Sequence, residues 1–150
     1  MFYNHLANKA KGDGIDRIAV GAVIFDEQSR ILILVRPSHE FMGGLEELPS
    51  GKLDGDEDIH TALLREVKEE SNLNITEVLS YVGHFDYKSK SGKQTRQYTF
   101  AVKTKTCDNV RLTEHDSFKW QTVAEALANP KISHNVKHCI QVATFNHNRV

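Results

Sequence analysis

Two strongly apolar segments near the N-terminus constrain the fold more than any other feature of the sequence. The first runs from Ile18 to Phe25 and the second from Ile31 to Val35, with a polar turn at 26–30 between them. Strands that are apolar on both faces need cover above and below their sheet. We therefore expect a buried hairpin in a mixed sheet that lies between layers of helices, an α/β/α arrangement.

Length and composition fit one domain. The chain has 150 residues, 39% of them hydrophobic, which is enough to fill a single core. Residues 1–16 lack clear periodicity, so we predict an N-terminal arm there and a single domain over 17–150. A net charge of −1 gives no field that would gather nucleic acid or a membrane surface. The two cysteines and the absence of an export signal favour the cytoplasm.

Shorter strands and helices follow. Leu45–Leu48 predicts a short strand before Pro49, and 78–87 and 94–102 predict an antiparallel pair. Alternation in the first of that pair places the following side chains on one face: Leu79, Tyr81, Gly83, Phe85 and Tyr87. The loop between the two strands holds Lys88, Lys90 and Lys93, which we interpret as a solvated turn rather than an anion-steering patch.

The last third of the chain predicts two helices. Thr122 and Glu125 form a capping-box pattern for a short helix that ends before Pro130. Ser133 can cap a final helix. An apolar stripe recurs in that helix at the spacing of a core-facing surface, through Val136, Cys139, Ile140 and Ala143.

One predicted helix, after Gly51, carries an unusual concentration of carboxylates. Asp54 or Asp56 can cap it, and Glu66 and Glu70 stand one turn apart beside Glu69. These acids repel one another near the helix end where the macrodipole is negative. A hard cation such as Mg²⁺ would offset the repulsion and still accept phosphate oxygens. The alternative is a solvated acidic helix face.

The spacing of these residues resembles the Nudix box, the signature of the Nudix hydrolases. The matching positions are Gly51, Glu57, Arg65, Glu66, Glu69 and Glu70. Asn72 replaces the last glycine of the box, and Ser50 replaces the first of two glycines after the proline. Asparagine tolerates positive φ well, so we expect the helix end to be preserved. The resemblance implies a Nudix-type α/β/α sandwich with a central mixed sheet.

The resemblance also implies a reaction, Mg²⁺-dependent hydrolysis of a diphosphate bond in a nucleotide derivative, with Mn²⁺ as a substitute. The catalytic residues it implies are Glu57, Arg65, Glu66 and Glu69. The metal ligands it implies are Gly51, Glu66, Glu69 and Glu70, with Glu114 as a further carboxylate on an opposing loop. It leaves open which glutamate is the general base.

Substrate recognition is less well encoded. Basic and aromatic side chains can contact phosphate or stack on a base. We expect these roles at Arg36, His39, Phe41, Phe85, Tyr87, Arg96 and Tyr98. The proline that ADP-ribose-cleaving members carry after the box is missing, which favours the mutator-type branch that cleans the nucleotide pool. Its members cleave nucleoside triphosphates, including damaged ones, to a monophosphate and pyrophosphate.

Other functions stay open. They include hydrolysis of a dinucleoside polyphosphate, and a nucleotide-sensing Nudix domain without catalysis, although such domains usually lose carboxylates that are present here. Isoprenoid diphosphate isomerisation would need an additional acid or cysteine, and Cys107 has no supporting context. His134 and His138 share a helix face, but no third zinc ligand lies nearby. Monomer and homodimer are both compatible with the sequence.

Overall fold

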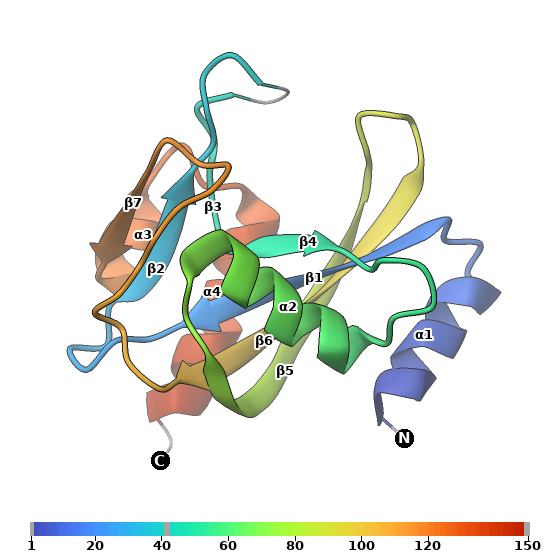
Figure 1. Ribbon diagram of the computed structural model, residues 1–150, viewed down its shortest axis with the longest axis horizontal. Helices are drawn as coiled ribbons and strands as arrows, with labels where there is room; N and C mark the ends of the chain where they lie inside the picture. Colours follow the sequence, from blue (N-terminus) through green and yellow to red (C-terminus); the bar gives the residue numbers. More distant parts are fainter. Residues whose placement is uncertain (1, 41–42, 149–150) are drawn as a thin grey trace.

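The computed structural model describes residues 2–40 and 43–148, in which helices cover both faces of a mixed four-stranded sheet that stands beside a smaller sheet (Figure 1). This confirms the predicted α/β/α arrangement. The helices are α1 (Phe2–Gly12), α2 (Ile59–Ser71), α3 (Val123–Ala128) and α4 (His134–Asn148). The strands are β1 (Arg17–Ile24), β2 (Ile31–Val35), β3 (Glu46–Glu47), β4 (Ser50–Lys52), β5 (Ile75–Lys88), β6 (Gln94–Thr104) and β7 (Ser117–Gln121). None of the described helices is both long and apolar enough to cross a bilayer.

The strands form two sheets, in the orders β4-β1-β6-β5 and β3-β2-β7. The predicted hairpin of β1 with β2 is therefore wrong. The two strands meet only at an isolated bridge between Phe25 and Ile31. Each is central in its own sheet: β1 pairs in parallel with β6, and β2 lies between β3 and β7. A central strand has neighbours on both edges, so two strands that are apolar on both faces need not pair with each other.

Two hydrophobic cores cover the two faces of the larger sheet. Val20, Ala22 and Ile24 of β1 point into the core that includes α1 and α2. Val23 points the other way, into the core that includes α3 and α4. The apolar character of β1 on both faces thus reflects cover on both faces, as the sequence indicated.

The N-terminal segment contains the helix α1, a regular element where the sequence shows no clear periodicity. Tyr98 Oη donates to the Leu6 carbonyl at 2.7 Å, and Arg96 Nη1 donates to Asp13 Oδ2 at 2.7 Å. The apolar residues that face the core share helical spacing, at Tyr3, Leu6, Ala7 and Ala10. Lysine, asparagine and histidine side chains between them weaken this pattern in the sequence, but burial against β6 stabilises the helix.

Strand β5 pairs with β6 antiparallel, as predicted, but it is irregular. Register shifts fall between Ile75 and Glu77, between Val78 and Ser80, and between Tyr81 and Gly83. Each bulge adds a residue that reverses which face the following side chains occupy. Tyr81 therefore packs in the core of α1 and α2, whereas Phe85 packs in the core of α3 and α4. The prediction that they share a face is wrong for this reason.

The C-terminal helices begin where the sequence predicts. Thr122 and Glu125 form the reciprocal capping box of α3. Ser133 Oγ accepts a hydrogen bond from the Val136 N–H at the start of α4. The predicted apolar stripe of α4 is buried. These features are local, so the sequence is sufficient to place them.

Candidate functional site

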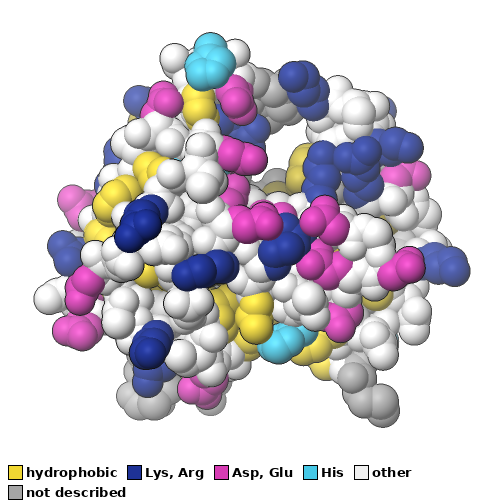
Figure 2. Space-filling view, viewed as in Figure 1, with side chains coloured by type: hydrophobic (Ala, Val, Ile, Leu, Met, Phe, Trp, Pro, Cys, Tyr) yellow, Lys and Arg dark blue, Asp and Glu magenta, His cyan; other side chains and the backbone are white. Residues whose placement is uncertain are grey.

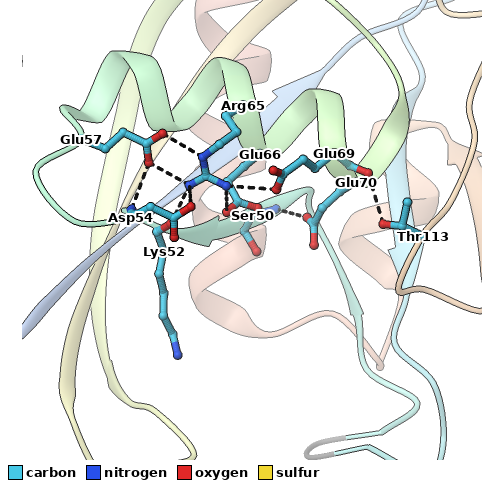
Figure 3. A network of polar contacts seen from close by, with 9 residues as sticks. All are labelled: Ser50, Lys52, Asp54, Glu57, Arg65, Glu66, Glu69, Glu70 and Thr113. Atoms are coloured by element: carbon cyan, nitrogen blue, oxygen red, sulfur yellow. Dashed lines mark hydrogen bonds and ion pairs between the residues drawn. The ribbon is translucent and has the colours of Figure 1, made fainter.

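Helix α2 positions the carboxylates along the edge of β4 (Figure 3). Its N-cap is Asp58, which accepts from the Thr61 N–H at 2.7 Å, so the predicted caps at Asp54 and Asp56 are wrong. It ends at Asn72, whose φ of 67° confirms the left-handed turn expected there. The apolar stripe of α2 packs on the sheet. The glutamates therefore lie on the remaining surface of the helix, next to β4.

Arg65 lies at the centre of the acidic cluster (Figure 3). Its Nε and Nη2 donate to the two oxygens of Glu57, each at 2.8 Å. Its Nη1 donates to Glu66 Oε1 at 2.8 Å and to Glu69 Oε2 at 3.0 Å. The hydrogen bond from Arg65 holds the pKa of Glu57 far below its usual range, at about 2. The guanidinium therefore neutralises part of the negative charge of the cluster.

Gly51 is held against this cluster by the β4–β1 pairing, where it lies opposite Val20. A Cβ at Gly51 would overlap the carboxylate of Glu66. Burial raises the pKa of the Glu66 carboxyl, and this effect is larger than the lowering caused by the hydrogen bond and charge of Arg65. The close approach of backbone and carboxylate explains why a glycine is needed at this position.

Glu70 is the most enclosed of the three neighbouring acids on α2, with 8% of its surface exposed. The Ser50 N–H donates to its Oε1 at 2.6 Å. Burial raises the pKa of Glu70 to about 8, although the Ser50 N–H and His115 both act to lower it. Its second oxygen lies 4.0 Å from His115 Nδ1.

His115 belongs to a partly buried polar group that was not predicted from the sequence. Its Nε2 lies 2.9 Å from Glu47 Oε2, and Arg36 Nη2 donates to both oxygens of Glu47. Its Nδ1 is buried and has no hydrogen-bond partner among residues 2–40 and 43–148. Because the Glu47 carboxylate accepts hydrogen bonds, Nε2 carries a proton and Nδ1 faces Glu70. Its one signal in the sequence is its position next to Glu114, the carboxylate predicted as a further metal ligand.

A cleft of about 750 Å³ adjoins the cluster. It lies between the loop after β2 and the β5–β6 hairpin, and Figure 2 shows the hollow on the molecular surface. The predicted site residues that line it are Arg36, His39, Gly51, Glu70, Phe85, Tyr87 and Glu114. Phe41, also predicted to contact substrate, lies outside the described residues.

Arg96 and Tyr98 do not line the cleft, which corrects their assignment to substrate binding. Arg96 Nε donates to Asp86 Oδ1 at 2.7 Å, and both Arg96 and Tyr98 bond to the α1 segment. Side chains alternate along β6, so these two face α1, while Gln97 between them lines the cleft. Their role is to hold α1 on the sheet.

The described part of the chain contains no group of three or more His, Cys, Asp or Glu side chains arranged to hold a metal ion. Glu66 and Glu69 each accept a hydrogen bond from Arg65, and of the three neighbouring glutamates of α2 only Glu70 lines the cleft. The donors nevertheless fit a hard divalent cation. The carboxylate of Glu66 lies against Gly51 in the space that a Cβ would fill, and Glu70 contacts the neighbouring Ser50 N–H, so both offer oxygens close to this stretch of backbone.

Comparisons with known proteins agree on one family. A family model described as the NUDIX domain matches residues 16–141. An 8-oxo-dGTP diphosphatase from Proteus vulgaris is 42% identical over 69 residues, 45% of this chain and 61% of that protein's length. A CTP pyrophosphohydrolase from Escherichia coli (strain K12) is 31% identical over 113 residues, 75% of this chain and 82% of that protein.

The fold also resembles solved structures. A MutT protein from Methanosarcina mazei Go1 superposes with a TM-score of 0.75 at 22% identity, covering 87% of this chain and 94% of that one. At this identity the likeness concerns the fold alone.

Proposed function

The chain belongs to the Nudix family, and from this premise we propose that it hydrolyses a diphosphate bond in a nucleotide derivative. The substrate we favour is a nucleoside triphosphate. Water adds to one phosphorus, the bond from that phosphorus to the bridging oxygen breaks, and a proton is released. The products are a nucleoside monophosphate and pyrophosphate. The observation that carries the proposal is the intact carboxylate cluster of α2 beside a large cleft, with Glu70 buried at their junction.

The relatives support the choice of substrate. By their names, the Proteus vulgaris and Escherichia coli proteins act on 8-oxo-dGTP and CTP, both nucleoside triphosphates. The alignment with the first spans about three fifths of its length, so that activity enters only as support for the proposal.

We propose that Glu66, Glu70 and the Gly51 carbonyl hold Mg²⁺, with Mn²⁺ as a substitute and with Glu69 and Glu114 as further candidate ligands. When bound, such an ion neutralises charge on phosphate oxygens and lowers the pKa of water. The all-oxygen donor set supports a hard cation.

The residues around these ligands have separate tasks. Arg65 keeps Glu57 and Glu66 in fixed orientations through charge-assisted hydrogen bonds. The Ser50 N–H fixes one oxygen of Glu70. Glu69 is our candidate for accepting the proton from water, because its side chain is 57% exposed and Arg65 contacts one of its two oxygens.

The test is a panel of nucleoside triphosphates and nucleoside diphosphate derivatives with Mg²⁺ or Mn²⁺, with identification of both products. We expect monophosphate and pyrophosphate from at least one triphosphate. We expect E70Q to lower kcat by about 100-fold or more, because it removes a charge close to the reacting phosphates. E77Q, which changes an exposed glutamate of β5, is the matched control and should keep full activity.

A wild-type protein that cleaves no member of the panel, but binds nucleotide, would instead be a non-catalytic sensing domain. Unchanged turnover in E70Q would show that this residue is not part of the reaction.

A further inference from the structure

Basic side chains from two parts of the fold line the cleft together. Lys52 of β4 and Lys88 and Lys90 of the β5–β6 hairpin are among its lining residues, and we call these three residues the basic wall. Figure 2 shows basic side chains beside the hollow, with acidic ones also at its edge. The net charge of the whole chain is only −1, so the basic wall is a local feature. A concave surface with one sign of charge concentrates the potential felt by an anion.

An ordered turn holds two of these lysines in place. The Ser89 N–H donates to the Lys93 carbonyl at 2.9 Å, and the Gly92 N–H donates to the Ser89 carbonyl at 2.8 Å. The Ser89 hydroxyl accepts from the Lys93 N–H at 3.1 Å and is itself nearly buried. Gly92 has a φ of 82°, which the turn requires and a glycine adopts at little cost. Lys88 and Lys90 therefore project from a hydrogen-bonded turn rather than from an irregular loop.

Three of the five glutamates that line the cleft, Glu46, Glu47 and Glu70, are already engaged by other groups. Glu47 bonds to Arg36 and His115, and Glu70 accepts from the Ser50 N–H. Within residues 2–40 and 43–148, none of the three wall lysines forms an ion pair with a carboxylate. The positive charge of these three lysines is therefore available to an anion that binds in the cleft.

We propose that Lys88 and Lys90, together with Lys52, form the subsite for the phosphates that leave as pyrophosphate. Lys52 follows Gly51 directly, so a phosphate chain that passes the candidate metal ligands continues onto the basic wall. Apolar side chains from Leu48, Phe85 and Val136 line other parts of the cleft and suit a base rather than a phosphate.

This inference rests on the proposed function and makes it more specific. Pyrophosphate carries more negative charge than a nucleoside monophosphate. A basic wall therefore selects a substrate with a free terminal phosphate over one that ends in a sugar.

Product inhibition tests the assignment, because it examines the two ends of the substrate separately. In the double variant K88Q/K90Q, we expect the inhibition constant of pyrophosphate to rise about 10-fold, and that of the monophosphate to change less than about twofold. The KM for the triphosphate should rise by about the same factor as the inhibition constant of pyrophosphate. The KM for a nucleoside diphosphate sugar should change less. K88R/K90R should restore most of the affinity for pyrophosphate.

K93Q is the matched control, because it removes the same charge from the same turn at a lysine that does not line the cleft. If K93Q raised the inhibition constant of pyrophosphate by the same factor, the lysines would only attract anions in general, and the proposed subsite would be wrong. A rise in the inhibition constant of the monophosphate instead of pyrophosphate would place the nucleoside end on the lysines. No change in either constant would also overturn it.

Calorimetric titration of the same variants with pyrophosphate and Mg²⁺ separates this inference from the proposed function. Suppose that wild-type protein hydrolyses no substrate, but K88Q/K90Q binds pyrophosphate more weakly than K93Q does. The subsite is then supported and the hydrolase assignment fails. If wild-type protein hydrolyses a substrate, but K88Q/K90Q and K93Q bind pyrophosphate with equal affinity, the hydrolase assignment is supported and the subsite fails.

Discussion

At the scale of single residues, the site depends on a few side chains whose neighbours leave little freedom. Arg65 contacts three glutamates and the Lys52 carbonyl at once, which only a planar guanidinium with several donors can do. Gly51 leaves room for Glu66, and Ser50 fixes Glu70 through its backbone. Even substitutions that change the size of these side chains only slightly should therefore affect function.

The guanidinium of Arg65 gives the first prediction. R65K keeps the charge but cannot bond to all of these acceptors, so we expect a loss of about 1–2 kcal/mol in unfolding free energy and about a 10-fold lower kcat. Denaturant unfolding and steady-state kinetics measure the two effects. R111K, at an exposed position, should change neither. Wild-type kinetics in R65K would show that the orientation of the glutamates does not depend on the guanidinium.

Gly51 gives the second prediction. In G51A the added methyl group meets the Glu66 carboxylate, which has to move, so we expect kcat to fall about 10-fold or more while the fold persists. G12A, where an added Cβ meets nothing within 4 Å, is the matched control. Activity within twofold of wild type in G51A would mean that the site tolerates displacement of Glu66.

The raised pKa of Glu70 predicts a pH effect in protein freed of metal by EDTA. The folded protein holds a proton on Glu70 up to about pH 8, whereas the unfolded chain releases it near 4.5. Wild type should therefore lose stability relative to E70Q as the pH rises from about 4.5 through 8, by up to a few kcal/mol. Urea unfolding at several pH values measures the difference. Parallel pH profiles for the two proteins would contradict a buried, protonated Glu70.

At the scale of elements, α1 and the irregular strand β5 decide which predicted residues reach the cleft. The bulges in β5 bring Phe85 and Tyr87 to the cleft while Tyr81 stays in the opposite core. The neighbouring strand β6 turns Arg96 and Tyr98 toward α1 instead. The same pair of strands thus serves the site with one face and the attachment of α1 with the other.

The attachment of α1 is tested by Y98F. This variant loses the 2.7 Å hydrogen bond to the Leu6 carbonyl, so we expect a loss of about 1 kcal/mol in stability with unchanged kcat and KM. Y87F, on the cleft side of β5, is the comparison for kinetics. If Y98F raised KM and left the stability unchanged, the result would support the original prediction that Tyr98 contacts the substrate.

At the scale of the whole molecule, the cleft is assembled from segments that are distant in the sequence. The loop after β2, the β4 strand, α2, the β5–β6 hairpin and the start of α4 all contribute lining residues. Under the proposed function, a cation or nucleotide that binds here would contact several of these segments and stabilise the folded state by mass action.

Thermal unfolding with Mg²⁺ tests this coupling. We expect the Tm of wild type to rise as Mg²⁺ is added, and to rise further with a nucleotide, because both bind only the folded protein. E66Q and E70Q should show a smaller rise, whereas E77Q should behave as wild type. An equal rise in all four proteins would place the stabilising ion elsewhere.

The sequence by itself determined the features that depend on near neighbours in the chain. The spacing of the glutamates, the left-handed end of α2 at Asn72, the capping box at Thr122 and the buried stripe of α4 all follow local patterns, and the structure contains them. Local hydrogen bonds and helical periodicity decide these features, so distant residues have little influence on them.

Only the tertiary structure decided which distant segments meet. It separated β1 from β2, packed one side of α1 against the core, and brought His115 to Glu47 and Glu70. It also placed Lys88 and Lys90 on the wall of the cleft, where the sequence favoured a solvated turn. Strand partners and bulges are chosen by competition among many pairings, and one extra residue in a strand reverses the face of all that follow. The chemistry of the acidic helix is therefore encoded locally, but the residues that face a substrate are fixed only by the assembled fold.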